Sequence, residues 1–518
     1  MGLGNKIKYL VGIEGNTREY LRPMVGYDCA NVTLGGAGYP ISLYHQQFLN
    51  FVEGIRPSIT GTISMISGLI DAVTDVAMGV ITDRTKSRYG KHRRYLIWGL
   101  LPFVISYVMK WCSFGLSATG NTGALFAYYL FASLLYSTGY TMMSIPHQAM
   151  LPTVAPRYFE RTQFKIIEYA FNSLGQFPSF VFMSLILGGT NMNDPSPADR
   201  NKYMLCGIVL AVWFLWSPIV CFFSTKEKSS LDLENPPMDY KYLFSEYAQV
   251  FKSRAFRQYF LINLLNYTAR SCYSYSDQYF LLSIADRYRI FNILNVVSGA
   301  AEFSGSPINY FLIRFKDKRI CGLALGPMMV AGLLINGFVT TKTPTFILYV
   351  AAILYNLGFS GPGFSITNFQ PDVTDVDELI TGRRREGVIT TFTSFVKKTV
   401  QSFMTGLLSY ALELFGYNTN AVKKTDQTAR AILGLRFISS WLPAALAAIS
   451  VVLIFLYKMD KHDHETIQRV IKEKHETGSC TITEHDKKRL ERIAGHAWED
   501  MWIGRGTVNR KLEELSGI

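Results

Sequence analysis

Two aspartates in an apolar stretch of the sequence are the clearest candidates for a functional site. In the stretch "DAVTDVAMGVITD", Asp71 and Asp75 are four positions apart with Thr74 between them, so on a helix both carboxylates lie on one face. A carboxylate at bilayer depth is costly, and two neighbouring carboxylates repel each other unless a cation lies between them or one holds a proton. The pattern predicts a cation or proton site, and permanent pairing with a fixed basic residue is the alternative.

A second set of polar residues interrupts the apolar stretch "QYFLINLLNYTARSCYSYSDQYF". Its members have helical spacing and should form one strip that faces a cavity. They are Asn263, Asn266, Arg270, Tyr273 and Asp277. Arg270 could bind an anionic substrate such as a uronide through a forked pair of hydrogen bonds, or it could pair with Asp277 or Asp28. Structural pairing is the favoured interpretation.

Long apolar stretches must position these residues. The chain has 518 residues, of which 49% are hydrophobic, 14% aromatic and only 18% charged, a composition that favours a membrane protein. A helix of about 20 apolar residues crosses a bilayer, and the sequence predicts twelve such spans. Their approximate limits are 25–49, 58–82, 95–116, 124–148, 166–190, 203–224, 258–283, 290–313, 320–340, 345–368, 388–416 and 432–457.

The basic residues predict which loops face the cytoplasm. The formal net charge is +13, yet the segment after residue 458 holds 11 Lys/Arg against 12 Asp/Glu. The excess therefore lies between the spans, where it has a topological meaning and does not indicate a nucleic-acid partner. Five alternate gaps carry 22 Lys/Arg and the opposite loops 9, so the rich set, including the loop that turns at Gly90, should be cytoplasmic. Both termini then lie inside. Because the N-terminus lacks a cleavable signal, we expect a multi-pass protein of the cell membrane.

The spacing of the spans predicts two halves. The widest gap, 225–257, is expected to be a central cytoplasmic loop between an N-terminal six-helix bundle (1–224) and a C-terminal one (258–458), with a cavity between the bundles. Segment 459–518 should form a charged cytoplasmic tail of two partly amphipathic helices, more often a solvated appendage than a functional domain. The sequence leaves the oligomeric state open.

The motifs give no support to enzymatic chemistry. His45 and His147 lie in or at the ends of spans without an adjoining nucleophile motif, and there is no Gly-rich phosphate loop followed by Lys-Ser/Thr. The cysteines indicate no disulfide framework, and Cys480 with the tail histidines matches no metal-ligand spacing. We therefore expect no enzyme and no cofactor. Because no motif suggests the use of ATP, any energy that the protein needs should come from an ion gradient.

Three blocks of sequence resemble one transporter family. They are "DAVTDVAMGVITDRTKSRYGKHRR" (Asp71 to Arg94), "SIPHQAMLPTVAPRYFERT" (Ser144 to Thr162) and "PDVTDVDELITGRRREGVITTFTSFVKK" (Pro371 to Lys398). Their order and spacing resemble the glycoside-pentoside-hexuronide:cation symporters, the relatives of melibiose permease. The resemblance implies an all-α polytopic membrane protein with the major-facilitator fold, in which twelve transmembrane helices form two six-helix bundles.

The resemblance also implies a cation site. Asp71, Thr74 and Asp75 match positions that line this site in the family, and Ser144 falls where melibiose permease has a further acid. Loss of that carboxylate should weaken Na+ binding, which modestly favours H+ as the coupling ion, although Na+ could still bind at Asp71 and Asp75. Lys398 matches a lysine whose ammonium can neutralise the acidic pair when no cation is bound.

The substrate positions depart further from the family pattern. Asn31 stands where a substrate-binding Asp is expected, Gln148 where a stacking Trp is expected, and Tyr169 where an Arg is expected. Amide and phenol groups can still bind or stack on a sugar, but galactoside specificity does not transfer. Asp28 could accept a hydroxyl or could be a plain helix-end residue. The predicted substrate-binding residues are Asn31, Asp28, Gln148, Tyr169, Asn266 and Arg270.

We therefore expect a secondary active transporter that couples H+ or Na+ to the symport of a sugar, glycoside or hexuronide by alternating access. Its partners would be a small carbohydrate and the lipid bilayer. One alternative is a carrier of lysolipids or other amphiphiles with the same fold, although the polar strip is more polar than an acyl chain needs. A second alternative is a sugar-binding membrane sensor that signals through the tail.

Overall fold

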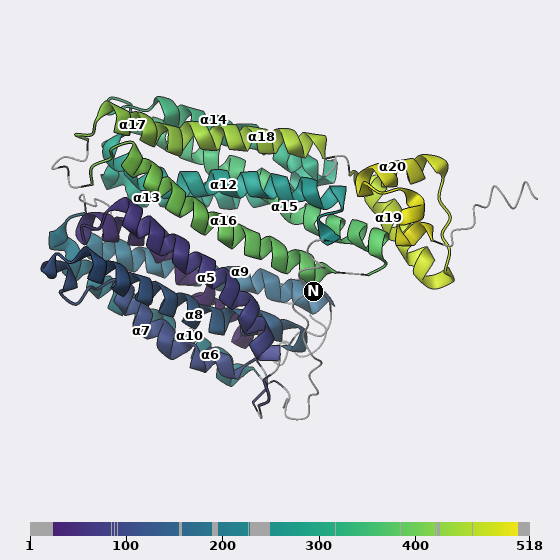
Figure 1. The fold of residues 1–518 in the computed structure, drawn as a ribbon, viewed down its shortest axis with the longest axis horizontal. Coiled ribbons are helices and arrows are strands. Elements are labelled where there is room, and N and C mark those ends of the chain that lie inside the picture. Colours follow the sequence, from purple (N-terminus) through teal and green to yellow (C-terminus); the bar gives the residue numbers. More distant parts are fainter. Residues whose placement is uncertain are drawn as a thin grey trace, which may run out of the picture. The chain divides into compact units, whose positions relative to one another are not determined.

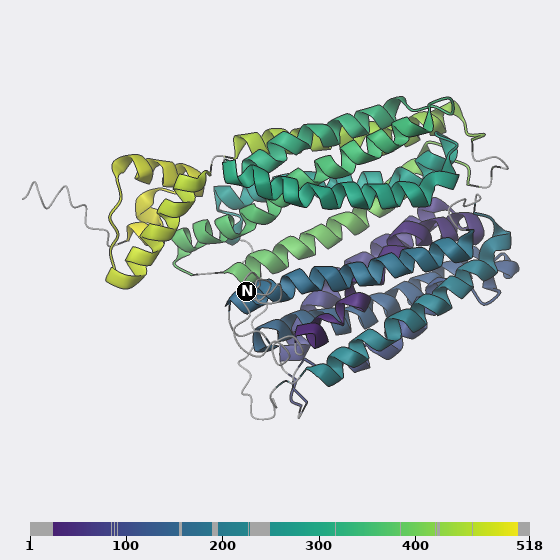
Figure 2. The same cartoon turned by 180° about the vertical axis from the view of Figure 1, so that it is seen from behind.

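The apolar stretches form long helices throughout the described part of the chain (Figures 1 and 2). The computed structural model describes residues 24–505 with short gaps. The gaps are 84, 88, 91, 155–157, 189–194, 226, 228–248, 316–317, 384, 420, 422–424 and 458. Contacts divide the chain into two compact units. The first unit contains Met1–Pro237, Tyr288–Asn292 and Thr405–Ala431, and the second contains Met238–Arg287, Ile293–Met404 and Ile432–Ile518.

The first unit begins with an interrupted helix. Its elements are α3 (Asn31–Gly36), α4 (Gly38–Pro40), η1 (Ile41–His45), η2 (Phe48–Val52), α5 (Pro57–Asp83), α6 (Arg94–Trp98), α7 (Leu100–Lys110), α8 (Thr122–Val154), α9 (Tyr158–Leu187) and α10 (Arg200–Ser224). Glycines let α3 approach α9 closely, because a Cβ on Gly36 would lie 2.6 Å from the backbone of Gly175. The long helix α5, which carries Asp71 and Asp75, packs on α8.

The second unit contains most of the later helices. They are α12 (Arg254–Ser283), α13 (Phe291–Phe315), α14 (Arg319–Phe338), α15 (Thr345–Thr381), α16 (Glu386–Leu414, whose last residues belong to the first unit), α17 (Ala429–Arg436), η6 (Phe437–Trp441), α18 (Leu442–Leu456), α19 (Lys461–Thr477), α20 (Glu484–Ala494), η7 (Trp498–Asp500) and η8 (Trp502–Gly504). Helix α14 packs on α15, and α12 packs on α18 and α15. Side chains on α12 and α15 thereby share one interior.

The helices match the predicted spans closely, with one large difference. Helix α15 runs on to Thr381, whereas the prediction ends this span at 368. Within the described residues, five helical segments are long and apolar enough to cross a membrane by composition alone. Helix α12 does not meet that criterion because its polar strip lowers the average hydropathy, although its 30 residues are long enough to cross.

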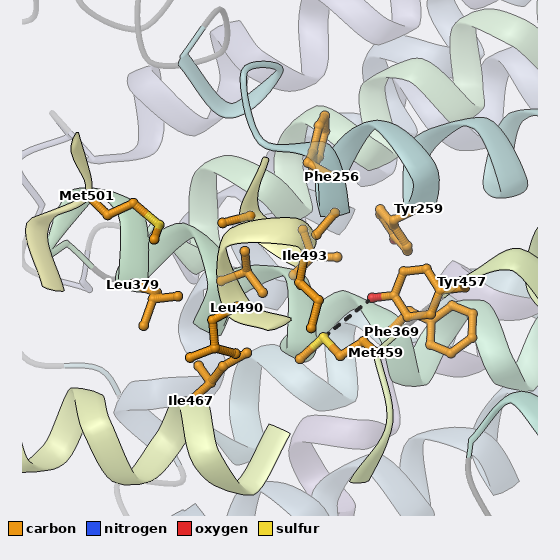
Figure 3. Packing of buried hydrophobic residues seen from close by; sticks show 14 of the residues in the cluster. Phe256, Tyr259, Phe369, Leu379, Tyr457, Met459, Ile467, Leu490, Ile493 and Met501 are labelled. Atoms are coloured by element: carbon orange, nitrogen blue, oxygen red, sulfur yellow. Dashed lines mark hydrogen bonds between the residues drawn. The ribbon is translucent and has the colours of Figure 1, made fainter. Parts of the chain in front are cut away.

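The C-terminal segment is docked, so its interpretation as a solvated appendage is wrong. Helices α19 and α20 with η7 and η8, which we call the tail module, contribute one side of a large buried apolar cluster. Figure 3 shows side chains of this cluster from α12, α15 and the tail module packed together. They include Phe256, Tyr259, Phe369, Leu379, Ile467, Leu490, Ile493 and Met501. The hydrophobic effect holds the tail module on the extended end of α15.

Polar contacts follow the same junction. The ring of His464 lies 3.2 Å from a carboxylate oxygen of Asp372, and the ring of His475 lies 3.1 Å from a carboxylate oxygen of Glu378. Both acids lie on the part of α15 beyond the predicted span. The charged residues of the tail thus pair with the end of a helix that begins in the bundle.

Candidate functional site

Three oxygen atoms converge where α5 meets α8. Asp71 and Asp75 are half-buried on one face of α5. The hydroxyl oxygen of Thr141, on α8, lies 3.1 Å from Oδ1 of Asp71 and 2.8 Å from Oδ1 of Asp75. These distances place the hydroxyl oxygen between the two acids. Its single hydrogen can be donated to only one carboxylate at a time. Carboxylate and hydroxyl oxygens are suitable ligands for a hard cation.

The other two predicted cation residues lie nearby with different contacts. The hydroxyl of Thr74 donates to the backbone carbonyl of Asp71 at 3.0 Å, which stabilises its own helix. Ser144 is buried on α8, three residues after Thr141 and therefore one helical turn along the same face. Thr141 is not among the residues predicted from the sequence. Its spacing from Ser144 was the signal that could have found it.

Lys398 lies on α16, half-buried, in the second unit. Asp71 and Asp75 belong to the first unit. Its electrostatic coupling to the acidic pair therefore stays a prediction.

Two predicted substrate residues of the first unit are in contact. The Nδ2 atom of Asn31 donates to Oδ1 of Asp28 at 3.2 Å, and both residues are buried. Gln148 is exposed on α8. Tyr169 belongs to α9, but its side chain lies outside the described residues. Within this set, the structure brings together Asp28 and Asn31.

The strip on α12 faces other helices of the second unit. Arg270 donates to Oε2 of Glu302, on α13, at 3.0 Å and to Oδ1 of Asn356, on α15, at 3.1 Å. Arg270 is thus paired within the protein, as the favoured interpretation expected, but the carboxylate that its guanidinium reaches is that of Glu302 and not that of Asp277. Asp28 belongs to the first unit, so its pairing with Arg270 stays a prediction. Glu302 lies within a predicted span, and the rule that singled out Asp71 could have identified it too.

Aromatic rings complete the surroundings of Arg270. Its guanidinium carbon lies 4.4 Å from the ring centre of Phe359 and 5.7 Å from that of Tyr355. The rings of Tyr273 and Tyr355 stack with centres 3.8 Å apart. Buried Asn266 lies one turn before Arg270 on α12. Forked donors, amides and aromatic faces together are the groups that bind sugar hydroxyls and sugar ring faces.

A buried acid fixes the basic loop that follows α5. Gly90 has a φ of +94°, which confirms its predicted role as the turn. The carboxylate of Glu227 accepts hydrogen bonds from the backbone N–H of His92 at 3.0 Å and of Arg93 at 3.1 Å, and lies 2.8 Å from Nδ1 of His92. Burial alone would raise the pKa of Glu227, but these hydrogen bonds outweigh burial and lower it. The carboxylate thus joins the end of α10 to the α5–α6 loop.

Comparisons with known proteins identify the family. The family described as MFS/sugar transport protein matches residues 26–461. A glucuronide carrier protein homolog of Escherichia coli is 23% identical, over 87% of this chain and 95% of its own. An isoprimeverose transporter of Lactiplantibacillus pentosus is also 23% identical, over 81% of this chain and 85% of its own. A sodium-dependent lysophosphatidylcholine symporter of Danio rerio is 21% identical, over 90% and 93%.

Solved structures agree on the fold. The xylose transporter XylE of E. coli, in a partially occluded inward-open conformation, has a TM-score of 0.57 at 10% identity and covers 86% of this chain and 98% of its own. A bacterial homolog of the human lysosomal transporter Spinster has a TM-score of 0.61 at 11% identity and covers 86% of this chain and 98% of its own. The chain is a polytopic helical membrane protein with the major-facilitator fold. It belongs to the MFS sugar-transport family and, within it, to the glycoside-pentoside-hexuronide:cation symporters.

Proposed function

We propose that this symporter binds its coupling cation between Asp71, Asp75 and Thr141, and that this binding permits the transport of a carbohydrate. The observation that carries the proposal is the position of the Thr141 hydroxyl within hydrogen-bonding distance of both carboxylates. A cation at this point, with the hydroxyl hydrogen turned away from it, would be held by three oxygens and would offset one of the two charges of the acidic pair. Neutralisation lowers the free-energy cost of enclosing the two carboxylates while the carrier changes the side of the membrane to which they are open.

The proton is the favoured coupling ion. Ser144 supplies no charge at the position of a family acid, so two carboxylates bear the whole interaction with a cation. Comparison of uptake into proteoliposomes under a proton gradient and under a sodium gradient distinguishes the two ions.

Each unit carries residues that we propose for sugar binding. Asp28 and Asn31 form a hydrogen-bonded pair in the first unit. In the second unit, Asn266, Arg270 and Tyr273 belong to the strip on α12, and Tyr355 of α15 stacks on Tyr273. Lys398 is assigned the role of counter-charge to the acidic pair. Binding of cation and sugar would then be linked through shared charge, so that the empty and the fully loaded carrier exchange sides and the partly loaded carrier does not.

Asp75→Asn tests the coupling role. The amide cannot take up a proton and brings no negative charge to hold a cation, so we expect loss of gradient-driven accumulation while some downhill exchange remains. Asp426→Asn is a matched control because Asp426 is exposed in a loop outside the helices. Wild-type accumulation by Asp75→Asn would remove Asp75 from the coupling role. Equal loss in both variants would point to an effect of charge in general.

A lysolipid is the competing cargo. One observation favours it, namely the similarity over 90% of this chain to a lysophosphatidylcholine symporter. The polar strip on α12 favours a sugar, because the buried amide of Asn266 has no hydrogen-bond partner in the described part of the chain and an acyl chain could not supply one. A panel of neutral sugars, sugar acids and lysolipids in the same uptake assay separates the two cargoes. We also assign the carrier to the cell membrane with both termini in the cytoplasm, on the distribution of Lys and Arg.

A further inference from the structure

A shallow recess lies in the second unit, where α12 begins and where α18 and α20 end. Two arginines line it, Arg254 at the start of α12 and Arg492 in the last turn of α20, together with the amide of Gln258. The rest of its wall is apolar and includes three side chains that Figure 3 shows close together, those of Tyr457, Met459 and Ile493. The recess is too small to enclose a whole small molecule, so it suits a charged group that binds at its mouth.

Close packing brings the two arginines to the same recess. Gly495 ends α20 with a φ of +77°, and a Cβ on it would lie 2.8 Å from the Cβ of Arg254. The end of α20 therefore lies directly against the start of α12. Arg492 is three residues before Gly495, less than one helical turn away. Both arginines are thus held beside each other by the contact between the two helices.

The charges of these two arginines are available to a ligand. Both residues are exposed, and in the part of the chain that the structure describes no carboxylate lies within ion-pair distance of either. The acids nearest to them in the sequence are engaged elsewhere. Asp460 and Asp463 pair with Arg489, and the carboxylate of Glu491 accepts the backbone N–H of Trp498 at 2.9 Å. An anion held between the two guanidiniums would offset both charges.

The recess adjoins an apolar surface of α18. In the last two turns of this helix, Val452 is 56% exposed, Phe455 68% and Leu456 48%. The segment to which α18 belongs is apolar enough to cross a membrane, so an exposed apolar surface on it is suited to contact with acyl chains. Leu456 directly precedes Tyr457, which lines the recess. The two arginines therefore lie at the level where acyl chains give way to headgroups.

A phospholipid combines the chemical groups that this position accepts. Arginine binds phosphate through forked hydrogen bonds, and basic sites at the cytoplasmic ends of membrane helices attract anionic headgroups. A free phosphate ion would use the two arginines but would leave the apolar wall without a role. The apolar surface of α18 next to the recess favours a ligand that carries acyl chains as well as negative charge.

We propose that the recess binds the phosphate of an anionic phospholipid in the cytoplasmic leaflet, with Arg254 and Arg492 as its two cationic partners. The amide of Gln258 donates to a glycerol or ester oxygen, and the acyl chains lie along the exposed side chains of α18. The bound lipid holds the end of α20 against α12, so that the tail module is fixed to the bilayer as well as to the second unit. The choice of leaflet rests on the proposed sidedness, whereas the site itself requires neither the coupling cation nor the sugar.

Lipid binding to the full-length protein tests the site directly. Native mass spectrometry during titration with phosphatidylglycerol gives a Kd, and phosphatidylcholine is the comparison lipid without net charge. Arg254→Gln and Arg492→Gln should each weaken phosphatidylglycerol binding about fivefold, and the double variant about 25-fold, as for the loss of one or two arginines from an anionic membrane surface. Arg469→Gln is the matched control, because Arg469 is exposed on α19 and does not line the recess. Its Kd should stay within about twofold of the wild type.

Hydrogen–deuterium exchange in nanodiscs shows what the lipid does to the tail module. At about ten times its Kd, phosphatidylglycerol should slow the exchange of α20 amides about tenfold relative to phosphatidylcholine alone. This slowing should be lost in the double Gln variant. Replacement of both arginines by Lys keeps the charges and should retain most of the binding, although the forked geometry is lost.

Several outcomes would overturn the lipid site. They are equal binding of phosphatidylcholine and phosphatidylglycerol, equal weakening by Arg469→Gln and by the two recess variants, and equal impairment of the Lys and Gln double variants. Displacement of the lipid by inorganic phosphate at the same concentration would show a site for free anions and would overturn the lipid assignment as well. Sugar uptake does not enter these measurements, so a failure of the lipid site leaves the proposed transport standing, and the reverse also holds.

Discussion

Arg489 joins the two helices of the tail module, and replacing it should open the module. Its Nε and Nη2 atoms each lie 2.9 Å from a carboxylate oxygen of Asp463, and Nη2 lies 2.7 Å from Oδ2 of Asp460. The two acids also cap α19, since each side chain accepts the backbone N–H of the other. The side chain of Asp463 is 2% exposed and that of Arg489 is 33% exposed. In Arg489→Gln the buried acid loses its guanidinium.

The size of the effect follows from this burial. Removing one partner of a fully buried ion pair costs about 3–5 kcal/mol. Because Arg489 is one-third exposed, water can replace part of the hydrogen bonding that its guanidinium supplies. We therefore expect Arg489→Gln to lower the free energy of opening the tail module by about 2–3 kcal/mol, within the range for hydrogen bonds to charged groups. At about 1.36 kcal/mol per factor of ten, amides of α19 and α20 that exchange by opening of the module should exchange roughly 30- to 160-fold faster.

Hydrogen–deuterium exchange of the full-length protein in nanodiscs measures this change. Lys488→Gln is the control, because it removes the neighbouring positive charge at an exposed residue for which the described part of the chain shows no ion pair. If the two variants exchange alike, or if Arg489→Gln stays within about twofold of the wild type, the argument from burial is refuted.

The same contacts predict a pH dependence. Partial burial would raise the pKa of Asp460, but the backbone N–H of Asp463 and the guanidinium of Arg489 outweigh burial and lower it. A carboxylate with a lowered pKa in the folded state stabilises that state above its unfolded pKa of about 3.9 and loses this contribution as the pH falls through the folded value. The part of the difference between wild type and Arg489→Gln that comes from Asp460 should therefore narrow below about pH 4. Burial raises the pKa of Asp463, so the part that comes from Asp463 should narrow at a higher pH.

Two further predictions concern the cation site and the tail. In Thr141→Val the shared hydroxyl is lost, so the cation concentration for half-maximal uptake should rise roughly 10- to 100-fold; Thr141→Ser should restore it, and Thr138→Val, on an exposed face of α8, should leave it unchanged. An unaltered value in Thr141→Val would exclude the hydroxyl from the site. Deletion of residues 460–518 uncovers apolar side chains such as Phe369 and Leu379, so the melting temperature in detergent should fall while the protein that remains folded keeps its uptake. Sugar binding without uptake by the full-length protein, with loss of its signal on deletion, would favour the sensor.

The sequence by itself determined the helices, the predicted sidedness and the family. Whether a stretch such as 203–224 spans a bilayer depends on its own side chains, because about 20 apolar residues suffice to cross, and α10 (Arg200–Ser224) matches that prediction. The acids Asp71 and Asp75 could be singled out for the same reason. Four residues apart on any helix, they share one face whatever packs against it.

Tertiary structure alone decided which side chains meet. Thr141 is 66 residues from Asp75 and reaches it only because α8 packs on α5, and Arg270 pairs with Glu302 only because α13 brings that acid within reach. The tail module was misjudged for a related reason. Its helices are so rich in charge that their narrow apolar faces predict a solvated segment, yet those faces are buried against α12 and against an end of α15 that lies beyond the predicted span. Hydropathy along the chain measures how much of a helix is apolar. Whether the apolar face of that helix is buried depends on whether another surface of the protein fits against it.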